Sequence, residues 1–313
     1  MSYTTGSAAN IAAVKTALVN AATAAGWTSA TDSDGKTVLS KSGVYVRVDD
    51  TTDEQSNPAL DLLGRTALES GPAPSVVSMR SMGSSTAIEA ITFPATYHIF
   101  TFTAAADDAD EVYCIINYGS TYQWCAFGKS LQAGMTGTGA WVAATSGYGT
   151  PDAAIYLTST GAGNYTGGDF TSAALFLTSS TSVSRTANRN GWVHTELDAS
   201  YPWSLAYGAN DGTIVGVKAY TELFDAQPNA MTGEGVFLPV RAYKSMPSTK
   251  YSQVLELLHC RHVRIDNYND EQIITLGTDQ WMVFPWYKKS LTEPNGGSGK
   301  YHTGTFGWAL RYA

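Results

Sequence analysis

The C-terminal part of the chain, from Gln227 onward, consists of short apolar and aromatic runs separated by Gly, Pro, Asn and Asp. Short runs of this kind between turn residues are typical of β-strands. The last run, Thr305 to Tyr312, almost reaches the C-terminus, and an end of that kind is ordered only when a strand or helix holds it. We therefore expect it to lie in a sheet. The same pattern predicts strands at 214–220, 235–243, 262–265, 273–276, 281–286 and 305–312, whereas 251–258 fits a short helix or a strand.

The N-terminal part predicts one helix, over residues 9–25. Apolar residues recur at helical spacing from Ile11 to Ala22. Ser7 or Asn10 can cap its start, and Gly26 ends it.

Further strands are predicted between the helix and residue 130. Alternating apolar and polar residues at 38–48 predict a half-buried hairpin, preceded by a turn at 32–35. Residues 49–75 are polar and acidic, which indicates a surface loop with one short helical turn at Leu60 to Leu63. A strand is predicted at 95–103. Residues 112–118 and 122–128 form a predicted hairpin whose turn is Gly119-Ser120-Thr121.

Residues 130–184 carry only two charged residues, Asp152 and Asp169, and are rich in glycine. Such a stretch is either a long loop or arm used in assembly, or a few short strands, such as 155–158 and 174–177, joined by glycine turns. On the arm interpretation, deleting Gly134 to Gly168 is expected to leave a folded chain that no longer assembles.

The predicted fold class is mainly β, a β-sandwich or jelly-roll-like fold with an N-terminal helix. The predicted regions are 1–130 (helix plus β), 131–190 (glycine-rich, low in charge) and 191–313 (C-terminal β), with one continuous domain as the alternative.

Charge and composition exclude several classes of protein. Charged residues make up 15% of the chain, against roughly 25% in average soluble domains. The net charge of −8 gives no broad basic surface for nucleic acid, and no apolar run approaches the ~20 residues of a membrane span. The N-terminus lacks the pattern of a signal peptide, so synthesis in a cytoplasm is expected. A low-charge surface fits a protein that packs against neighbours, or an ordinary β protein with a neutral surface.

No residue is predicted to be catalytic, to bind a cofactor or to bind a metal. The nearest approach to a metal site, His259-Cys260-Arg261-His262, lacks the second ligand pair that a structural zinc site needs, so these residues are interpreted as buried or interfacial polar residues. Acidic groups at 49–54, 107–111 and 266–271 lack the spacing of a calcium loop, so solvated turns explain them as well as calcium does. Nucleophile and phosphate-binding motifs are missing. The three cysteines are interpreted as small buried hydrophobic residues, and two of them, Cys114 and Cys125, can face each other across the hairpin.

Aromatic residues are the main candidates for an interaction surface. Exposed aromatics stack on sugars or form the centres of protein interfaces, and buried ones fill a β core. One basic group, at 241–264, is set against Glu256 alone and indicates a subunit contact or a solvated face. The residues predicted to lie in an interface are Tyr122, Trp124, Trp286, Tyr287, Trp308, Tyr312, Arg241 and Arg264.

Several sequence blocks resemble a family of virion structural proteins of tailed bacteriophages. They are Ala-Ala-Gly-Trp at 24–27, Ala-Thr-Tyr-His-Ile-Phe at 95–100, Tyr-Gln-Trp-Cys-Ala-Phe-Gly-Lys at 122–129, Gln-Pro-Asn-Ala at 227–230, Leu-Pro-Val at 238–240, Arg-Ile-Asp-Asn-Tyr at 264–268, Ile-Thr-Leu-Gly at 274–277, Phe-Pro-Trp-Tyr-Lys-Lys at 284–289 and His-Thr-Gly-Thr-Phe-Gly-Trp-Ala-Leu-Arg-Tyr at 302–312. The resemblance covers most of the chain and is patchy between 130 and 226. These blocks are strand and turn signatures and contain no catalytic motif.

The resemblance implies a structural subunit of a phage particle, without enzymatic activity or cofactor. Such a subunit would assemble in symmetric copies at the tail, the neck or collar, or the baseplate. Its partners would be copies of itself and other virion proteins, and its location the virion. The alternatives are a carbohydrate-binding module that recognises a host-surface glycan and a glycan-cleaving enzyme, which would need two carboxylates in a groove.

Overall fold

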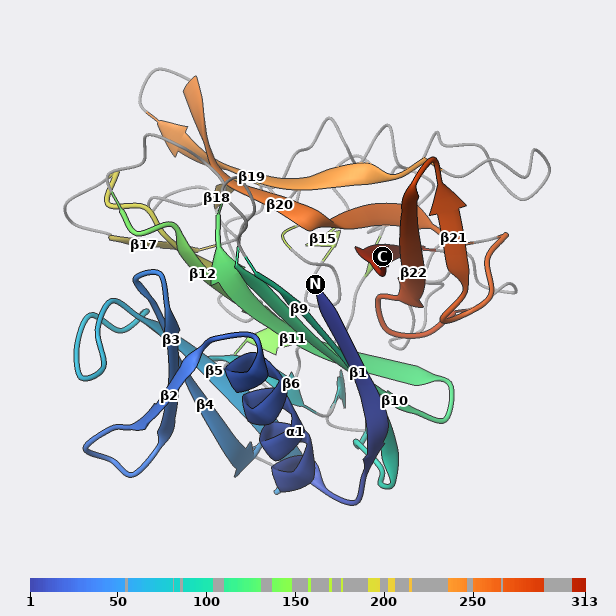
Figure 1. Ribbon diagram of the computed structural model, residues 1–313, viewed down its shortest axis with the longest axis horizontal. Helices are drawn as coiled ribbons and strands as arrows, with labels where there is room; N and C mark the ends of the chain where they lie inside the picture. The colour runs from blue at the N-terminus through green and yellow to red at the C-terminus, as the bar shows by residue number, and fades with distance from the viewer. Residues whose placement is uncertain are drawn as a thin grey trace.

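The fold is a sandwich of three antiparallel β-sheets with a single described helix, as Figure 1 shows. The predicted fold class, mainly β with an N-terminal helix, is confirmed, and the sandwich has three layers. The computed structural model describes residues 1–53, 56–80, 82–84, 87–103, 110–130, 137–147, 157–158, 169–170, 176, 191–197, 202–205, 214–215, 236–246, 250–265, 267–289 and 306–313.

The middle layer, which we call the central sheet, is buried on both faces. On strand β10, Cys114 and Ile116 face one neighbouring layer, whereas Tyr113 and Ile115 face the other. Burial on both sides explains why the inner strands β10, β11 and β12 are mainly apolar instead of alternating, whereas the edge strand β1 is polar and largely exposed. In spatial order, its strands are β1 (Ser2–Ala8), β9 (Ala95–Phe102), β10 (Glu111–Tyr118), β11 (Thr121–Lys129), β12 (Ala140–Ala144), β16 (Gly191–His194) and β17 (Trp203–Leu205).

The second layer, the helix-side sheet, takes five of its strands from the chain between β1 and β9, which are themselves neighbours in the central sheet, and its edge strand β13 from the chain after β12. In spatial order, its strands are β13 (Ser146–Gly147), β6 (Val77–Arg80), β5 (Pro58–Arg65), β4 (Val44–Thr52), β3 (Thr37–Lys41) and β2 (Thr28–Thr31). Two separate strand pairs are β7 (Met82–Ser84) with β8 (Ala87–Glu89), and β14 (Leu157–Thr158) with β15 (Asp169–Phe170).

Helix α1 (Ile11–Ala24) packs beside the helix-side sheet against the central sheet (Figure 1). Its side chains Val14 and Leu18 are fully buried, as the helical spacing predicts. The Asn10 side chain accepts a hydrogen bond from the backbone N–H of Ala13 at 2.9 Å, so of the two predicted caps the structure uses Asn10. Gly26 follows the helix at φ +86°, a conformation that glycine adopts without strain.

The third layer, the C-terminal sheet, covers the opposite face of the central sheet. β20 (Lys250–Arg264) is one continuous strand, so the segment 251–258 is a strand and joins the one predicted at 262–265. β23 (Phe306–Arg311) lies between β20 and β22 (Asp279–Pro285), which confirms that the predicted C-terminal strand is held in a sheet. In spatial order, its strands are β18 (Ile214–Val215), β19 (Leu238–Met246), β20 (Lys250–Arg264), β23 (Phe306–Arg311), β22 (Asp279–Pro285) and β21 (Ile273–Leu276).

Three local predictions are wrong. Residues 49–75 are not one surface loop, because β4 runs to Thr52 and β5 spans Pro58–Arg65. Residues 60–63 form no helical turn, because they belong to β5, where Leu60 and Leu62 are fully buried beneath the helix-side sheet. In the β10–β11 hairpin, Tyr118 pairs with Thr121, so Thr121 belongs to the strand and only Gly119 and Ser120 form the turn.

The glycine-rich region contributes a core strand. β12 lies inside the predicted region 131–190 and is buried in the central sheet, so this part of the region is no arm. The central sheet takes strands from all three predicted regions. Of the predicted strand 155–158, the described part is β14. The predicted strand 174–177 lies outside the described residues except for Phe176, which packs on Trp141. Residues 216–220 of a strand expected to begin at Ile214 also lie outside them.

Cysteines Cys114 and Cys125 face each other in register across the β10–β11 hairpin. Together with Cys260 they are free and buried, so their interpretation as small hydrophobic residues is confirmed.

Candidate functional site

Five of the six predicted interface aromatics lie in the core instead. They pack between the central sheet and the C-terminal sheet, where the Trp124 and Trp308 ring centroids are 4.7 Å apart. The Tyr122 N–H donates a 2.7 Å hydrogen bond to the Tyr287 carbonyl. Because these side chains are enclosed by the chain itself, they do not contact a partner, and their assignment to an interface is wrong. The five are Tyr122, Trp124, Trp286, Tyr287 and Trp308.

The other three predicted interface residues remain partly exposed. Tyr312 packs edge-on against Tyr3 at 5.2 Å, beside the same core. Arg241 pairs with Glu256 at 2.7 Å, and Arg264 ends β20. These three stay predictions for an interface.

The basic group at 241–264 forms no single charged surface. Arg241 is neutralised by Glu256, and Lys244 is buried. Arg261 lies over the Trp281 ring at 5.0 Å and donates hydrogen bonds to carbonyls of its own strand. The charges are therefore used within the fold.

A buried carboxylate, Glu111, joins the central sheet to the C-terminal sheet. It begins β10 and faces the same side as Tyr113, whose hydroxyl donates to it at 2.8 Å. Opposite it, β20 bulges away from β19, so that the backbone N–H groups of Leu258 and His259 lack strand partners. Both donate to Glu111, at 2.9 and 3.3 Å. We call this arrangement the Glu111 junction.

Burial sets the protonation of the Glu111 junction. Removal from water raises the pKa of Glu111 to about 7, despite three hydrogen bonds that favour its charged form. A pKa near neutrality is typical of an acid–base catalyst. Yet Glu111 is completely enclosed, so in this conformation it reaches no substrate. Its arrangement fits the joining of two sheets.

A second polar junction lies around Glu271, which precedes β21. Its carboxylate accepts hydrogen bonds from Asn117 at 2.9 Å and Tyr122 at 3.0 Å. The Nε2 atom of His98 lies 3.3 Å away without hydrogen-bond alignment, and Tyr3 contacts the other ring nitrogen of His98 at 2.8 Å. His98 and these hydrogen bonds lower the pKa of Glu271 to about 2. This junction ties β21 to the central sheet.

The histidines of the His259–His262 cluster are buried on β20 and stay neutral. Burial lowers the pKa of each to about 3, assisted at His259 by the charge of Arg311. His262 packs edge-on against Trp286. Among the residues that the structure describes, no three His, Cys, Asp or Glu side chains converge in a way that would hold a metal ion.

Acidic residues near the helix-side sheet are paired with cations. Asp49 and Asp50 point to opposite faces of β4, where they pair with Lys36 at 2.7 Å and Lys15 at 2.5 Å. Of the acidic group 107–111, Asp110 pairs with Lys41 at 2.8 Å. Residues 107 and 108 lie outside the described residues. The described acids therefore stabilise the sheet through ion pairs.

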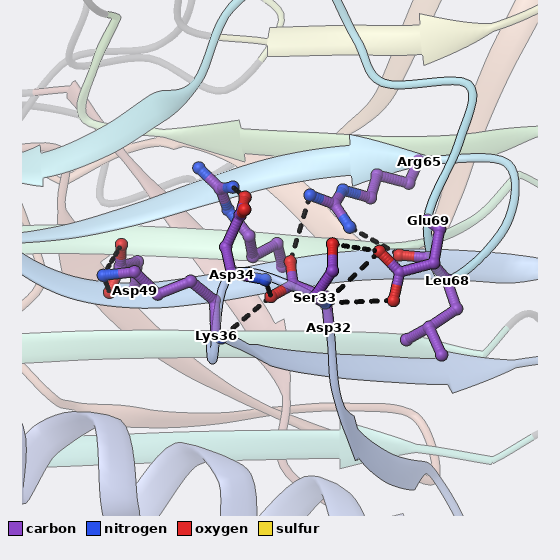
Figure 2. Close-up of polar contacts among 9 residues, drawn as sticks. Asp32, Ser33, Asp34, Lys36, Asp49, Arg65, Leu68 and Glu69 are labelled. Carbon is purple, nitrogen blue, oxygen red and sulfur yellow. Dashed lines mark hydrogen bonds and ion pairs between the residues drawn. The ribbon is translucent and has the colours of Figure 1, made fainter.

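The turn after β2 shows how these charges are used (Figure 2). Asp32 accepts a 2.8 Å hydrogen bond from the Lys36 N–H and pairs with Arg65 at 3.1 Å. Burial alone would raise the pKa of Asp32, but these two contacts outweigh it and hold the pKa below its usual range. Ser33 donates to Glu69 at 2.9 Å, so the cluster fixes the turn to the loop after β5.

Two exposed apolar side chains lie on the edge strand β21, on its opposite faces because they are three residues apart. Ile273 is 43% exposed and Leu276 is 44% exposed. Within the described part of the chain, β21 pairs only with β22 and ends the C-terminal sheet. A strand edge with apolar side chains is a ready template for pairing with another chain. The strand was predicted, but its edge position was not, because register and sheet order depend on distant segments.

No protein-family model and no curated protein matches this chain. Among the described residues, the one helix has 14 residues and is too short to cross a lipid bilayer.

Proposed function

We propose that this protein is a structural subunit of a tailed-bacteriophage particle, which assembles in symmetric copies at the tail, the neck or collar, or the baseplate. The observation that carries the proposal is the edge strand β21, which presents Ile273 and Leu276 to solvent.

The core supports the resemblance to virion proteins. Blocks that carry it, at 122–129, 284–289 and 302–312, are far apart in sequence and meet in one aromatic core. They therefore act together to specify one fold. Since the same aromatics are buried, they offer no row of rings for stacking on sugars, and the carbohydrate-binding alternative loses its main argument.

Burial of β21 in a contact between subunits would explain why apolar side chains lie on this edge strand. Full burial of one Ile or Leu side chain contributes about 1.5–3 kcal/mol, and a neighbouring strand would satisfy the free backbone groups of the edge. The Glu271 junction holds β21 in place, so little order has to be gained on binding.

The oligomeric state of the purified protein tests the proposal, by light scattering combined with negative-stain imaging. We expect the wild type to form rings or other regular multimers. The double substitution Ile273→Glu, Leu276→Glu should give monomers with an unchanged unfolding midpoint, because it places two charges at the contact.

Ala12→Glu is the control, because Ala12 is exposed on helix α1, which packs with the helix-side sheet and not with the C-terminal sheet. It should assemble as the wild type does. A wild type that remains monomeric at all concentrations would contradict assembly of the purified chain, and a double variant that still forms multimers would exclude β21 as the contact.

A further inference from the structure

A cavity of about 230 Å³ opens where the end of β9, strand β20 and the end of β23 meet. The two ends of the chain lie close together in this part of the molecule (Figure 1). Ala313 is held there by hydrogen bonds with the backbone of Gln280. The cavity is lined by Met1, Phe102, Thr103, His259, Arg311 and Ala313.

His259 is the unusual residue in this lining. Its side chain is only 3% exposed, and neither ring nitrogen has a hydrogen-bond partner. The ring stacks on Phe102, with centroids 4.0 Å apart and planes 6° from parallel. Buried polar atoms without partners destabilise a fold, so they call for an explanation such as a bound group.

Cations outnumber anions around this cavity: Arg311, Arg261 and the N-terminal amine act on His259, against the Asp279 carboxylate that pairs with Arg311 and the C-terminal carboxylate of Ala313. Arg311 forms one contact with Asp279, 2.8 Å from Nη2, and a guanidinium has five N–H donors. After burial, the charges of Arg311, Arg261 and the N-terminal amine are what lower the pKa of His259. The ring is therefore neutral, with one N–H to donate and one nitrogen to accept.

We propose that this cavity binds a small organic carboxylate, whose oxygens accept hydrogen bonds from Arg311 and His259. Phe102 and Met1 contact the apolar part of the ligand. The volume suffices, since an apolar cavity of about 150 Å³ holds a benzene molecule. This site is independent of the edge strand and of assembly.

Calorimetric titration of the full chain with benzoate tests the proposal. We expect saturable binding of one benzoate for each chain. His259→Phe keeps the stacking but removes both nitrogens, and Arg311→Gln removes the charge. Each should weaken binding about tenfold or more, because a hydrogen bond to a charged group is lost.

Arg241→Gln is the control, since it removes a guanidinium that pairs with Glu256 and does not line the cavity. It should bind benzoate as the wild type does, whereas uncharged benzamide should bind the wild type about tenfold more weakly. If His259→Phe fails to fold, Arg311→Gln decides. The absence of saturable binding would mean that the cavity holds only water and would overturn the proposal, as would equal affinity in the wild type and the cavity variants.

Discussion

Glu111 shows how one residue determines the joining of two sheets. Its carboxylate satisfies two backbone N–H groups at the bulge of β20, and without it these donors would be buried and unpaired. Arg261 satisfies carbonyls of the same bulge. The irregular part of β20 is thus stabilised from both sides.

The raised pKa of Glu111 predicts a pH-dependent stability. The folded state binds the proton more tightly than the unfolded state, so the stabilisation is complete below about pH 4.5 and is lost as the pH rises through 7. Relative to Glu111→Gln, the wild type should lose about 3 kcal/mol of unfolding free energy between pH 5 and pH 8, at 1.36 kcal/mol for each pKa unit. Urea unfolding of both proteins at the two pH values measures this.

Glu256→Gln serves as the control for that experiment. Burial would raise the pKa of Glu256, but its contacts with Arg241 and Gln253 hold it below its usual range. It is therefore ionised in both states over most of the interval, and its difference from the wild type should stay nearly constant. If the difference in unfolding free energy between the wild type and Glu111→Gln also stays constant from pH 5 to pH 8, Glu111 is ionised in the folded protein and the prediction is wrong.

The buried histidines predict the opposite sign in acid. A neutral His262 with a pKa of about 3 stabilises the fold above the unfolded value of about 6.5, and this contribution is lost as the pH falls. Relative to His262→Phe, the wild type should lose about 2–3 kcal/mol between pH 7 and pH 4.5. Chemical unfolding at these pH values measures it, and parallel curves would show that His262 is not buried as a neutral ring.

At the residue scale, the sequence did not predict the Glu111 junction. Glu111 was read as the end of an acidic turn, although it stands two residues before Tyr113 and so shares its face. The bulge that needs a carboxylate lies about 150 residues further on, and nothing local reveals it. His259 and His262 were correctly preferred as buried residues.

At the scale of elements, the aromatic strands form the core. Trp308 is fully buried in β23, an inner strand of the C-terminal sheet, and contacts the rings of Tyr113 and Trp124 in the central sheet. Trp308→Ala should lower the free energy of unfolding by about 3–5 kcal/mol, because it leaves a cavity. Thermal or urea unfolding measures this.

Tyr312→Ala is the matched comparison, since Tyr312 is partly exposed at the end of the same strand run. It should cost clearly less stability. A Trp308→Ala protein as stable as the wild type, but unable to assemble, would restore the interface interpretation.

Element prediction succeeded where signals are local. Helix α1 follows from its spacing, its Asn10 cap and Gly26, and the β10–β11 hairpin from its two apolar runs. Strand β5 was missed although Leu60 and Leu62 alternate with Asp61, because polar residues on both sides of the segment obscured this alternation. β12 was missed because Ala140–Ala144 lies among glycines, and only its neighbours β11 and β16 make it a strand.

At the scale of the whole molecule, β12 changes the expected result of a deletion. Removing Gly134 to Gly168 takes out a buried strand of the central sheet, so we now expect an unfolded or aggregated chain. Removing only residues 159–168 keeps every strand of the three sheets and should leave a folded protein. Circular dichroism and size-exclusion chromatography distinguish the outcomes, and a folded Gly134–Gly168 deletion would mean that the central sheet tolerates the loss of β12.

The three-layer arrangement was beyond reach of the sequence. Long apolar strands such as β10 and β11 indicate burial on both faces, but which segments cover each face depends on sheet order. The sandwich class followed from the strand pattern, whereas the placement of the C-terminal sheet over the central sheet did not.

Strands β2 to β6 of the helix-side sheet lie in the sequence between β1 and β9, and this has a consequence for folding kinetics. Strands β2 to β6 pair mostly with their sequence neighbours, as do β9 to β12, and such local hairpins close quickly. Ser2–Ala8 must instead close a loop of almost ninety residues to reach β9, at a higher entropic cost. We therefore expect the two hairpin arrays to form before the N-terminal strand adds to the edge of the central sheet.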